Sequence, residues 1–202
     1  MGDAGKTPGW GSAFGGLAAA ERMRLRRRLV GGVAGLDRPP SAFAFRERTG
    51  MISCLLRPAT DADRDRITAI WHASASLPGV GPPSMPSRAE LRRRVDEEMA
   101  GGWEVTIAES GHEILGFVAI RRRDRILAEL FLSPKRIGGG IGKVLLDHAK
   151  AAMPGGFTLF TTSANSRARH FYEREGLIAL REEPHPRSGH PVTYYEWVGA
   201  GT

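Results

Sequence analysis

One stretch constrains this chain more than any other: a buried strand that runs into a glycine loop and then into an apolar helix. Residues 130–146 read Leu-Phe-Leu-Ser-Pro-Lys-Arg-Ile-Gly-Gly-Gly-Ile-Gly-Lys-Val-Leu-Leu. Glycines let the backbone turn sharply and approach a ligand closely. The first turn of the helix adds amides without intrahelical partners and a partial positive charge. The stretch predicts an anion site, most naturally for a pyrophosphate, unless the loop is a connection that binds nothing. Its residues are Arg136, Gly138, Gly139, Gly140, Gly142 and Lys143.

Charge and composition narrow the class of protein. The chain has 202 residues, a formal net charge of +7 and one cysteine, Cys54. This length suits one domain, and no run of residues is apolar and long enough to cross a bilayer. A single cysteine excludes a disulfide framework and fits a cytoplasmic protein. The histidines lack metal-ligand spacing, so we expect no metal.

The positive charge is concentrated in the first 50 residues. They hold nine of the 29 basic and four of the 22 acidic residues, which leaves a net charge of only +2 for the rest. The total therefore does not indicate a nucleic-acid-binding domain. We expect residues 1–50 to be a disordered basic leader and residues 51–202 to be the folded domain.

The later pattern alternates short apolar strands with amphipathic helices. We expect strands at 52–57, 103–109, 114–122, 126–132, 157–161, 177–180 and 192–198. Helices should follow the capping boxes that begin at Thr60 and Ser87, and should cover 141–153 and the segment after Asn165. Loops at 77–86 and 181–191 separate them, and the arginine runs at 92–94 and 121–123 are expected on solvated faces. The order β-α-α-β-β-β-α-β-α-β-β predicts an α/β domain with a mixed sheet.

Several templates compete for the glycine loop. A Walker loop needs Ser or Thr after its lysine, but Val144 follows Lys143. Gly139-Gly-Ile-Gly142 fits the clamp of an RNA-binding KH domain, which would make the chain a non-catalytic module. A KH loop joins two helices, however, whereas this loop follows a strand.

A second motif lies downstream: Asn165-x-x-Ala168-x-x-Phe171-Tyr172-x-x-x-Gly176. Together with Leu130-Phe-Leu-Ser-Pro and the glycine loop, it resembles the GNAT superfamily of acetyl-coenzyme A-dependent N-acetyltransferases. The resemblance implies a mixed, twisted sheet flanked by helices, and an acyltransferase that acts on a primary amine of a small molecule or protein. It also implies acetyl-CoA as co-substrate and a possible homodimer. Cys54, in the first predicted strand, is expected to be a buried apolar group rather than an acyl carrier, which favours direct transfer in a ternary complex. The charge distribution and the lack of a long apolar run predict no nucleic acid or membrane partner.

The same resemblance assigns residues to the coenzyme. Backbone groups at Phe131 and Leu132 would hold the pantetheine, and the loop would hold the pyrophosphate. The family has Gln or Arg where this chain has Ile137, and Arg136 could substitute. The implied coenzyme-binding residues are Phe131, Leu132, Arg136, Ile137, Gly138, Gly139, Gly140, Ile141, Gly142, Lys143, Asn165, Ala168, Phe171 and Tyr172.

Two residues could carry the catalysis. Tyr172 occupies the family position that protonates the departing thiolate; a core tyrosine beside Phe171 is the alternative. Glu129 is the one charge in an apolar strand, where an unused carboxylate costs free energy. It is either the base that deprotonates the amine or a salt-bridge partner of one of the arginines at 121, 122, 123 and 125. Asn165 would bond the pantetheine, cap its helix, or do both.

Overall fold

The computed structural model describes residues 41–47, 50–186 and 188–199, and side chains from Cys54 onward. Residues 1–40 of the predicted leader lie outside these ranges. The strands are β1 (Ser41–Glu47), β2 (Gly50–Pro58), β3 (Glu104–Ser110), β4 (Glu113–Arg121), β5 (Ile126–Leu132), β6 (Phe157–Thr162), β7 (Ile178–Pro184) and β8 (Pro191–Trp197). The helices are α2 (Arg64–Ala75), α3 (Arg88–Ala100), α4 (Ile141–Ala152) and α5 (Ser166–Arg174), with short 3₁₀ turns η2 (Asp61–Asp63) and η3 (Pro134–Arg136).

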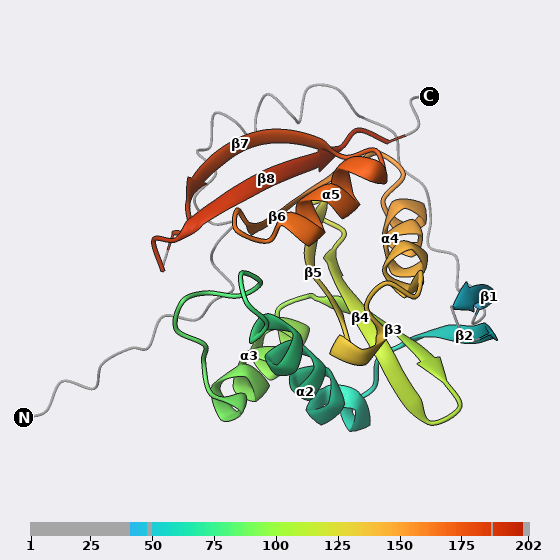
Figure 1. Ribbon diagram of the computed structural model, residues 1–202. Coiled ribbons are helices and arrows are strands. Elements are labelled where there is room, and N and C mark those ends of the chain that lie inside the picture. The colour runs from blue at the N-terminus through green and yellow to red at the C-terminus, as the bar shows by residue number, and fades with distance from the viewer. Residues whose placement is uncertain (1–40, 48–49, 187, 200–202) are drawn as a thin grey trace, which may run out of the picture. The chain divides into compact units, whose positions relative to one another are not determined.

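The strands form one mixed sheet flanked by helices (Figure 1). Among the described residues it has eight strands in the order β1-β2-β3-β4-β5-β6-β8-β7. Every pairing is antiparallel except that of β5 with β6. This architecture confirms the predicted α/β class and mixed sheet.

The predicted element order is confirmed from β2 onward. Two features differ from the prediction: an additional strand, β1, and the length of β7. β1 pairs with β2 along its length, although the sequence analysis placed these residues in the leader and predicted no strand. β7 extends to Pro184, so the loop predicted at 181–191 is shorter than expected. The polar run Arg-Glu-Glu is compatible with a strand because β7 is the last strand of the sheet and is largely exposed.

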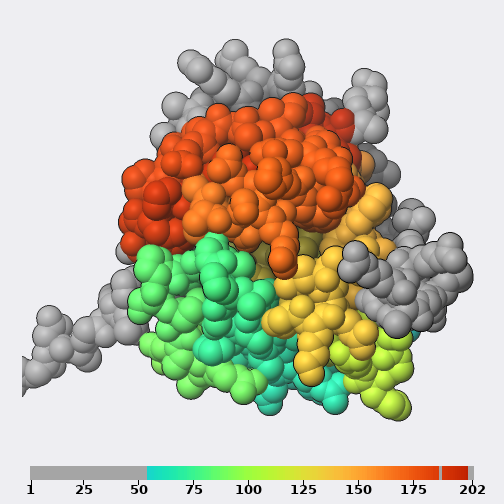
Figure 2. Space-filling view, in the orientation of Figure 1, coloured from blue at the N-terminus to red at the C-terminus, as the bar shows by residue number. Residues whose placement is uncertain are grey.

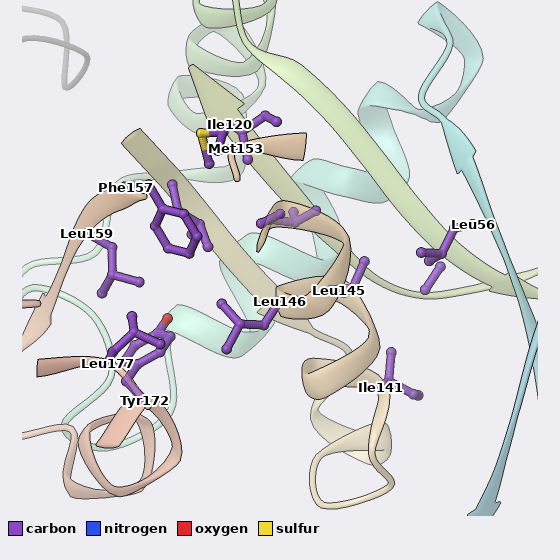
Figure 3. Close-up of a cluster of buried hydrophobic side chains, with 14 of the residues drawn as sticks. Leu56, Ile120, Ile141, Leu145, Leu146, Met153, Phe157, Leu159, Tyr172 and Leu177 are labelled. Atoms are coloured by element: carbon purple, nitrogen blue, oxygen red, sulfur yellow. The ribbon is translucent and has the colours of Figure 1, made fainter. Parts of the chain in front are cut away.

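The two faces of the sheet carry separate cores. One core lies under α4 and α5 and includes Leu127, Leu145, Leu146 and Tyr172 (Figure 3). The other lies under α2 and α3 and includes Trp71, Val95, Trp103 and Phe117. β4 is buried on both faces, and β5 contributes side chains to both cores, as its apolar sequence predicts.

A buried carboxylate fixes the start of α2. Asp63 accepts hydrogen bonds from Arg57 at 2.8 and 2.9 Å and from the amide and hydroxyl of Thr60 at 2.7 and 2.8 Å. The predicted capping box at Thr60 is therefore present, and it is extended by an arginine from β2. These four donors, the Arg57 guanidinium foremost, hold the pKa of Asp63 well below its usual range.

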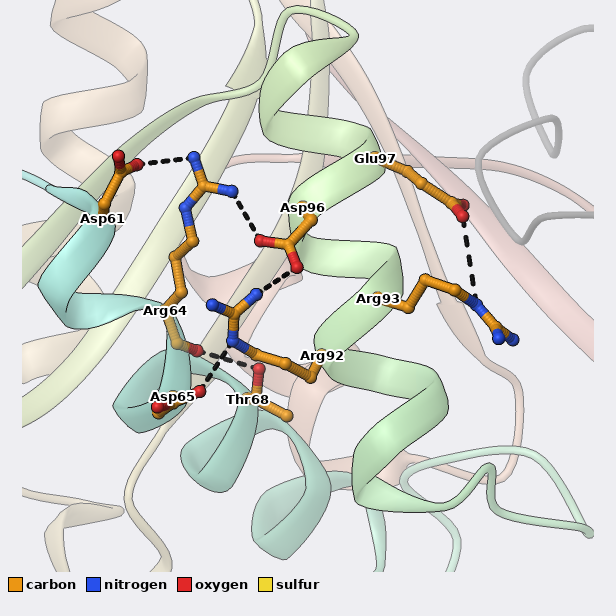
Figure 4. Close-up of polar contacts among 8 residues, drawn as sticks. All are labelled: Asp61, Arg64, Asp65, Thr68, Arg92, Arg93, Asp96 and Glu97. Atoms are coloured by element: carbon orange, nitrogen blue, oxygen red, sulfur yellow. Dashed lines mark hydrogen bonds and ion pairs between the residues drawn. The ribbon is translucent and has the colours of Figure 1, made fainter.

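Helices α2 and α3 are also joined at their surface (Figure 4). Arg64 of α2 lies between Asp61 and Asp96, and Arg92 of α3 lies between Asp65 and Asp96. Both aspartates that precede or begin α2 are exposed, so each pair contributes little alone. The network orients two helices that are held together mainly by packing of the apolar core beneath them.

Within the described residues, no helix is both long enough and apolar enough to span a membrane.

Replacing the buried carboxylate should cost far more than replacing an exposed one in the same turn. We expect Asp63→Asn to lower the free energy of unfolding by about 2–3 kcal/mol, because it leaves Arg57 without its bidentate partner. Asp61→Asn, whose side chain is 89% exposed, is the matched control and should change stability by less than about 1 kcal/mol. Urea unfolding at pH 7 measures both. The folded pKa of Asp63 is depressed, so the difference should shrink as the pH falls below 4; equal losses for the two variants would contradict this role.

Candidate functional site

β5 and β6 separate almost as soon as they meet. Their only paired residues are Ile126 and Thr158, supported by a 3.0 Å bond from the Thr158 amide to the Arg125 carbonyl. Beyond this point β5 stays paired to β4, and β6 stays paired to β8. We call the opening between residues 127–132 of β5 and 159–162 of β6 the fork. Main-chain groups of β5 that face it have no strand partner, and buried backbone polar groups require one.

The surface is hollowed near the fork (Figure 2). In that view the hollow lies between the orange atoms of α5 and β6 above and the green and yellow atoms of α2 and the segment before α4 below. The glycine loop lies near the end of the fork where β5 ends, because only the short turn η3 separates it from that strand.

A β-bulge in β5 determines which way Glu129 points. Ala119 pairs with Glu129 and Ile120 with Leu127, so Ala128 is an extra residue in the ladder. Leu127 packs in the core under α4, whereas Ala128 packs in the core under α2 and α3. In a regular strand Glu129 would face α4, like Leu127. The bulge turns it to the face of α3 instead.

The glycine loop presents backbone donors. Gly138 and Gly140 have φ of 90° and 87°, a conformation that side-chain-bearing residues rarely adopt. Among the described residues, no amide from Ile137 to Gly142 donates a hydrogen bond, whereas the Lys143 amide already bonds the Gly140 carbonyl at 3.0 Å. A Cβ at Gly138 would meet nothing within 4 Å, so side chains do not fill the space there. The loop is built as a row of open donors at a helix N-terminus.

The charged residues of the loop are paired within the protein. Arg136 donates to Glu113 of β4 at 2.6 and 3.3 Å. Lys143 contacts Asp147 at 2.8 Å and Glu175 at 3.5 Å. The backbone amides of the loop, by contrast, donate to no described residue.

The two predicted motifs meet at the start of α4. A Cβ built on Gly142 would lie 3.6 Å from the Phe171 ring and 3.6 Å from Leu132. Phe171 and Ala168 of α5 pack on the core beneath α4. Asn165 caps α5, accepting from the Ala168 amide at 3.1 Å, so the capping interpretation is confirmed. Strand end, glycine loop and second motif thus surround one place.

Tyr172 is buried, with a hydroxyl that bonds no described residue. The residue is 7% exposed, and its ring lies 5.3 Å from that of Phe171 and 5.7 Å from that of Tyr195. Burial raises its pKa well above the ordinary value, and the negative charge of Glu129 raises it further. The phenol is therefore protonated at neutral pH, and its pKa depends on the charge of Glu129. The structure brings these two candidate residues into one electrostatic environment.

Glu129 has a partner that the sequence analysis missed. Its Oε1 accepts a hydrogen bond from Nη2 of Arg94 in α3 at 3.1 Å. The alternative partners proposed from sequence were wrong: Arg121 pairs with Glu98 and Arg122 with Glu104, and the partner of Glu129 comes from α3 instead. Burial raises the pKa of Glu129 to about 7, although the charge of Arg94 opposes this.

The expectation that residues 92–94 form a solvated face was wrong for Arg94, whose side chain is 12% exposed. A signal for its burial is present in the sequence. Leu91, Arg94, Val95 and Glu98 have i, i+3, i+4, i+7 spacing, so two charges share the buried stripe of α3.

The two loops expected to select the acceptor converge at the end of β6. Thr162 donates to the carbonyl of Val80 in the 77–86 loop at 3.0 Å. Its hydroxyl also lies 3.4 Å from Nε2 of His190, which follows β7. Ser188 joins His190 to His185, with 2.7 Å to Nδ1 of each ring. These contacts gather polar groups at the end of β6, the strand on the other side of the fork from β5.

Among the described residues, no group of three or more His, Cys, Asp or Glu side chains could hold a metal ion.

A family model described as an acetyltransferase (GNAT) domain matches residues 83–198. The chain belongs to the GNAT acetyltransferase family. It is an acyltransferase, as the sequence motifs predict, and the matched region includes the fork, the glycine loop and Tyr172. The RNA-binding alternative finds no support, and the loop leads from β5 through η3 into α4 rather than joining two long helices.

Solved structures share this fold. Apo-form YjaB from Escherichia coli has a TM-score of 0.59 at 22% identity, over 73% of this chain and 99% of that protein. A phosphinothricin acetyltransferase from Sinorhizobium meliloti, solved in complex with acetyl-CoA, has a TM-score of 0.57 at 21% identity, over 74% of this chain and 90% of that protein. A protein described as histone acetyltransferase HPA2 and related acetyltransferase, from Corynebacterium glutamicum, has a TM-score of 0.56 at 23% identity, over 73% of this chain and 97% of that protein.

The environment of Glu129 predicts a pH-dependent stability difference. Its pKa is about 7 when folded, against 4.5 for an unperturbed glutamate, so folding favours its protonated form. Its contribution is fully present below pH 4.5 and is lost as the pH rises through 7. Relative to Glu129→Gln, the wild-type protein should lose up to about 3 kcal/mol between pH 4.5 and 8. Urea unfolding across this range measures the difference, and parallel stability curves would contradict the assignment.

Proposed function

We propose that this chain transfers an acetyl group from acetyl-CoA to a primary amine of a small molecule or protein, directly within a ternary complex. The observation that carries the proposal is the fork, where β5 leaves its main chain unpaired and leads into a loop of open amides. The loop fits a pyrophosphate, because its amides from Ile137 to Gly142 donate to no described residue and the space beside Gly138 is open. Phe131 and Leu132 lie where the unpaired edge of β5 would bond an extended amide-bearing arm, as in a parallel strand.

The acetyl-CoA-bound relative from Sinorhizobium meliloti supports this choice of co-substrate, since it shares the fold. The arm of the coenzyme supplies a thioester, whose acyl carbon an amine attacks. This chain then has to remove a proton from the amine, stabilise the oxyanion and protonate the leaving thiolate. Backbone amides of β5 at the fork are suited to the second task.

Glu129 is suited to act as the base. A carboxyl with a pKa of about 7 is substantially ionised at neutral pH and is a stronger base than an exposed glutamate. It takes the proton from the amine either directly or through water. Its hydrogen bond to Arg94 leaves the second carboxylate oxygen available for this purpose.

Tyr172 is suited to act as the acid. Its pKa is raised in part by the charge of Glu129, so protonation of Glu129 removes that contribution. Uptake of the amine proton by the base therefore makes the phenol a better donor at the moment when the thiolate leaves. Asn165 would position the start of α5, on which Tyr172 lies, in addition to any contact with the arm.

The acceptor would enter beside the end of β6, where Val80, Thr162 and His190 lie in contact. These groups, rather than the coenzyme loop, would determine which amine is accepted. Whether that amine belongs to a small molecule or a protein, and whether the chain forms a homodimer, stay predictions from the family resemblance.

An acceptor screen tests the reaction. Purified protein with acetyl-CoA and a panel of amines should release thiol with at least one acceptor. Tyr172→Phe should lower kcat by about 10²-fold or more with little change in stability, because the ring is kept and the hydroxyl bonds no described residue. Unchanged kcat for Tyr172→Phe would contradict its role, and absence of thiol release with every class of amine would contradict the proposed reaction.

A matched glycine pair tests the coenzyme loop. Gly140→Ala and Gly111→Ala place a side chain at φ of 87° and 59°, so each should cost about 1 kcal/mol of stability. Only Gly140 lies in the proposed pyrophosphate site, whereas Gly111 is in the β3–β4 turn. By calorimetry, coenzyme A affinity should fall about tenfold or more for Gly140→Ala and stay unchanged for Gly111→Ala. Equal affinities for the two variants would contradict the site.

A further inference from the structure

Arg94 occupies an unusual position for a helix arginine. Its guanidinium carbon lies 4.5 Å from the centroid of the Trp71 ring and 6.0 Å from that of Trp103. The faces of these rings attract a cation and leave it little freedom. Because the side chain is only 12% exposed, neither water nor salt screens it strongly.

The Arg94 guanidinium lies between two carboxylates. Nη2 of Arg94 is 3.1 Å from Glu129, and Nε is 4.0 Å from Glu98 one helical turn away. Glu98 is 6% exposed and also pairs with Arg121. The four charged groups form a chain in the order Glu129, Arg94, Glu98, Arg121. Glu129, at one end of this chain, lies on β5 beside the fork.

We propose that Arg94 is a positioning residue that holds the Glu129 carboxylate at the fork and sets its charge state, with Glu98 acting in the opposite sense. The proposal rests on the proposed role of Glu129 as the base. Within the described residues, the groups that face Glu129 are Arg94 and Glu98 from α3 and Tyr172 from α5. α2 contributes the Trp71 ring, and β4 contributes Ala119 opposite.

The two α3 groups act with opposite signs. Arg94 lowers the pKa of Glu129 and Glu98 raises it, while burial exceeds both. A packing role alone would make each substitution change stability and leave the titration of Glu129 in place. A role in setting the charge moves that titration up for one variant and down for the other.

The experiment measures the titration of Glu129 directly in the coenzyme-free protein. Carbon-13 NMR of the glutamate side-chain carboxyl carbons follows each group with pH, and Glu129→Gln identifies the resonance. In Arg94→Gln we expect the Glu129 midpoint to rise by about one pH unit or more, and in Glu98→Gln to fall. Arg94→Lys keeps the charge and should lie closer to the wild-type protein than Arg94→Gln does.

Arg93→Gln is the matched control. Arg93 neighbours Arg94 on α3 but is 61% exposed and faces Glu97, so the Glu129 midpoint should stay in place. If Arg94→Gln does not fold, the downward movement in Glu98→Gln decides the matter. A Glu129 midpoint that stays unmoved in the folded Arg94 or Glu98 variants, or that moves equally in Arg93→Gln, overturns the proposal.

Kinetics link this charge to turnover. The acidic limb of kcat/KM should move with the NMR midpoint in each variant; a limb that stays fixed while the midpoint moves also overturns the proposal. Failure of the proposed function has a different signature, since the wild-type protein would then release no thiol. The titration does not depend on activity, so it would still decide whether Arg94 governs Glu129.

Discussion

The site depends on main-chain hydrogen-bonding groups of β5 that the fold leaves without partners. β5 and β6 are neighbours in a sheet, yet they pair only at Ile126 and Thr158. A strand within a sheet normally has hydrogen-bond partners on both sides, and an unpaired one costs free energy unless something else supplies the partners. The same strand leads through η3 into a loop whose amides, from Ile137 to Gly142, donate to no described residue. Both features are explained together if an extended, anion-bearing ligand completes the sheet and the helix terminus.

The position of Glu129, the proposed base, follows from the same strand. A single extra residue, Ala128, changes the face on which Glu129 lies, and so brings it to α3 rather than α4. There it meets Arg94, which the aromatic rings of the second core hold in place. Tyr172 approaches from the other core, so the site lies where the two cores meet at the fork. Each core therefore contributes one member of the proposed acid–base pair.

Local signals were sufficient for most of the fold and for locating the two motifs that meet at the proposed coenzyme site. Capping boxes at Thr60 and Ser87 begin helices where the pattern predicted. The apolar run at 126–132 is one strand, although only Ile126 and Leu127 are fully buried and the rest is partly exposed at the fork. The glycine loop and the Asn165–Gly176 motif meet because they belong to successive βα units packed on one face.

What sequence could not provide depends on register and on contacts between distant segments. The bulge at Ala128 is a relation between two strands, and nothing in the alternation of 126–132 reveals it. The Arg94–Glu129 bond joins residues 35 apart, although the i, i+3, i+4, i+7 pattern in α3 already indicated that Arg94 lies on a buried face. The strand at Ser41–Glu47 borders a strongly basic segment that masks its pattern, although Phe43 and Phe45 alternate with small residues.

The most direct test of this account is a map of backbone amide chemical shifts on addition of coenzyme A. The account predicts saturable changes at Ile137 to Gly142 and along 127–132 of β5, with dephospho-coenzyme A affecting the same residues. Amides on the outer strand β7 should stay unperturbed. Saturable binding that leaves the loop and the fork-facing edge of β5 unchanged would contradict the central claim that the gap in this sheet is the coenzyme site.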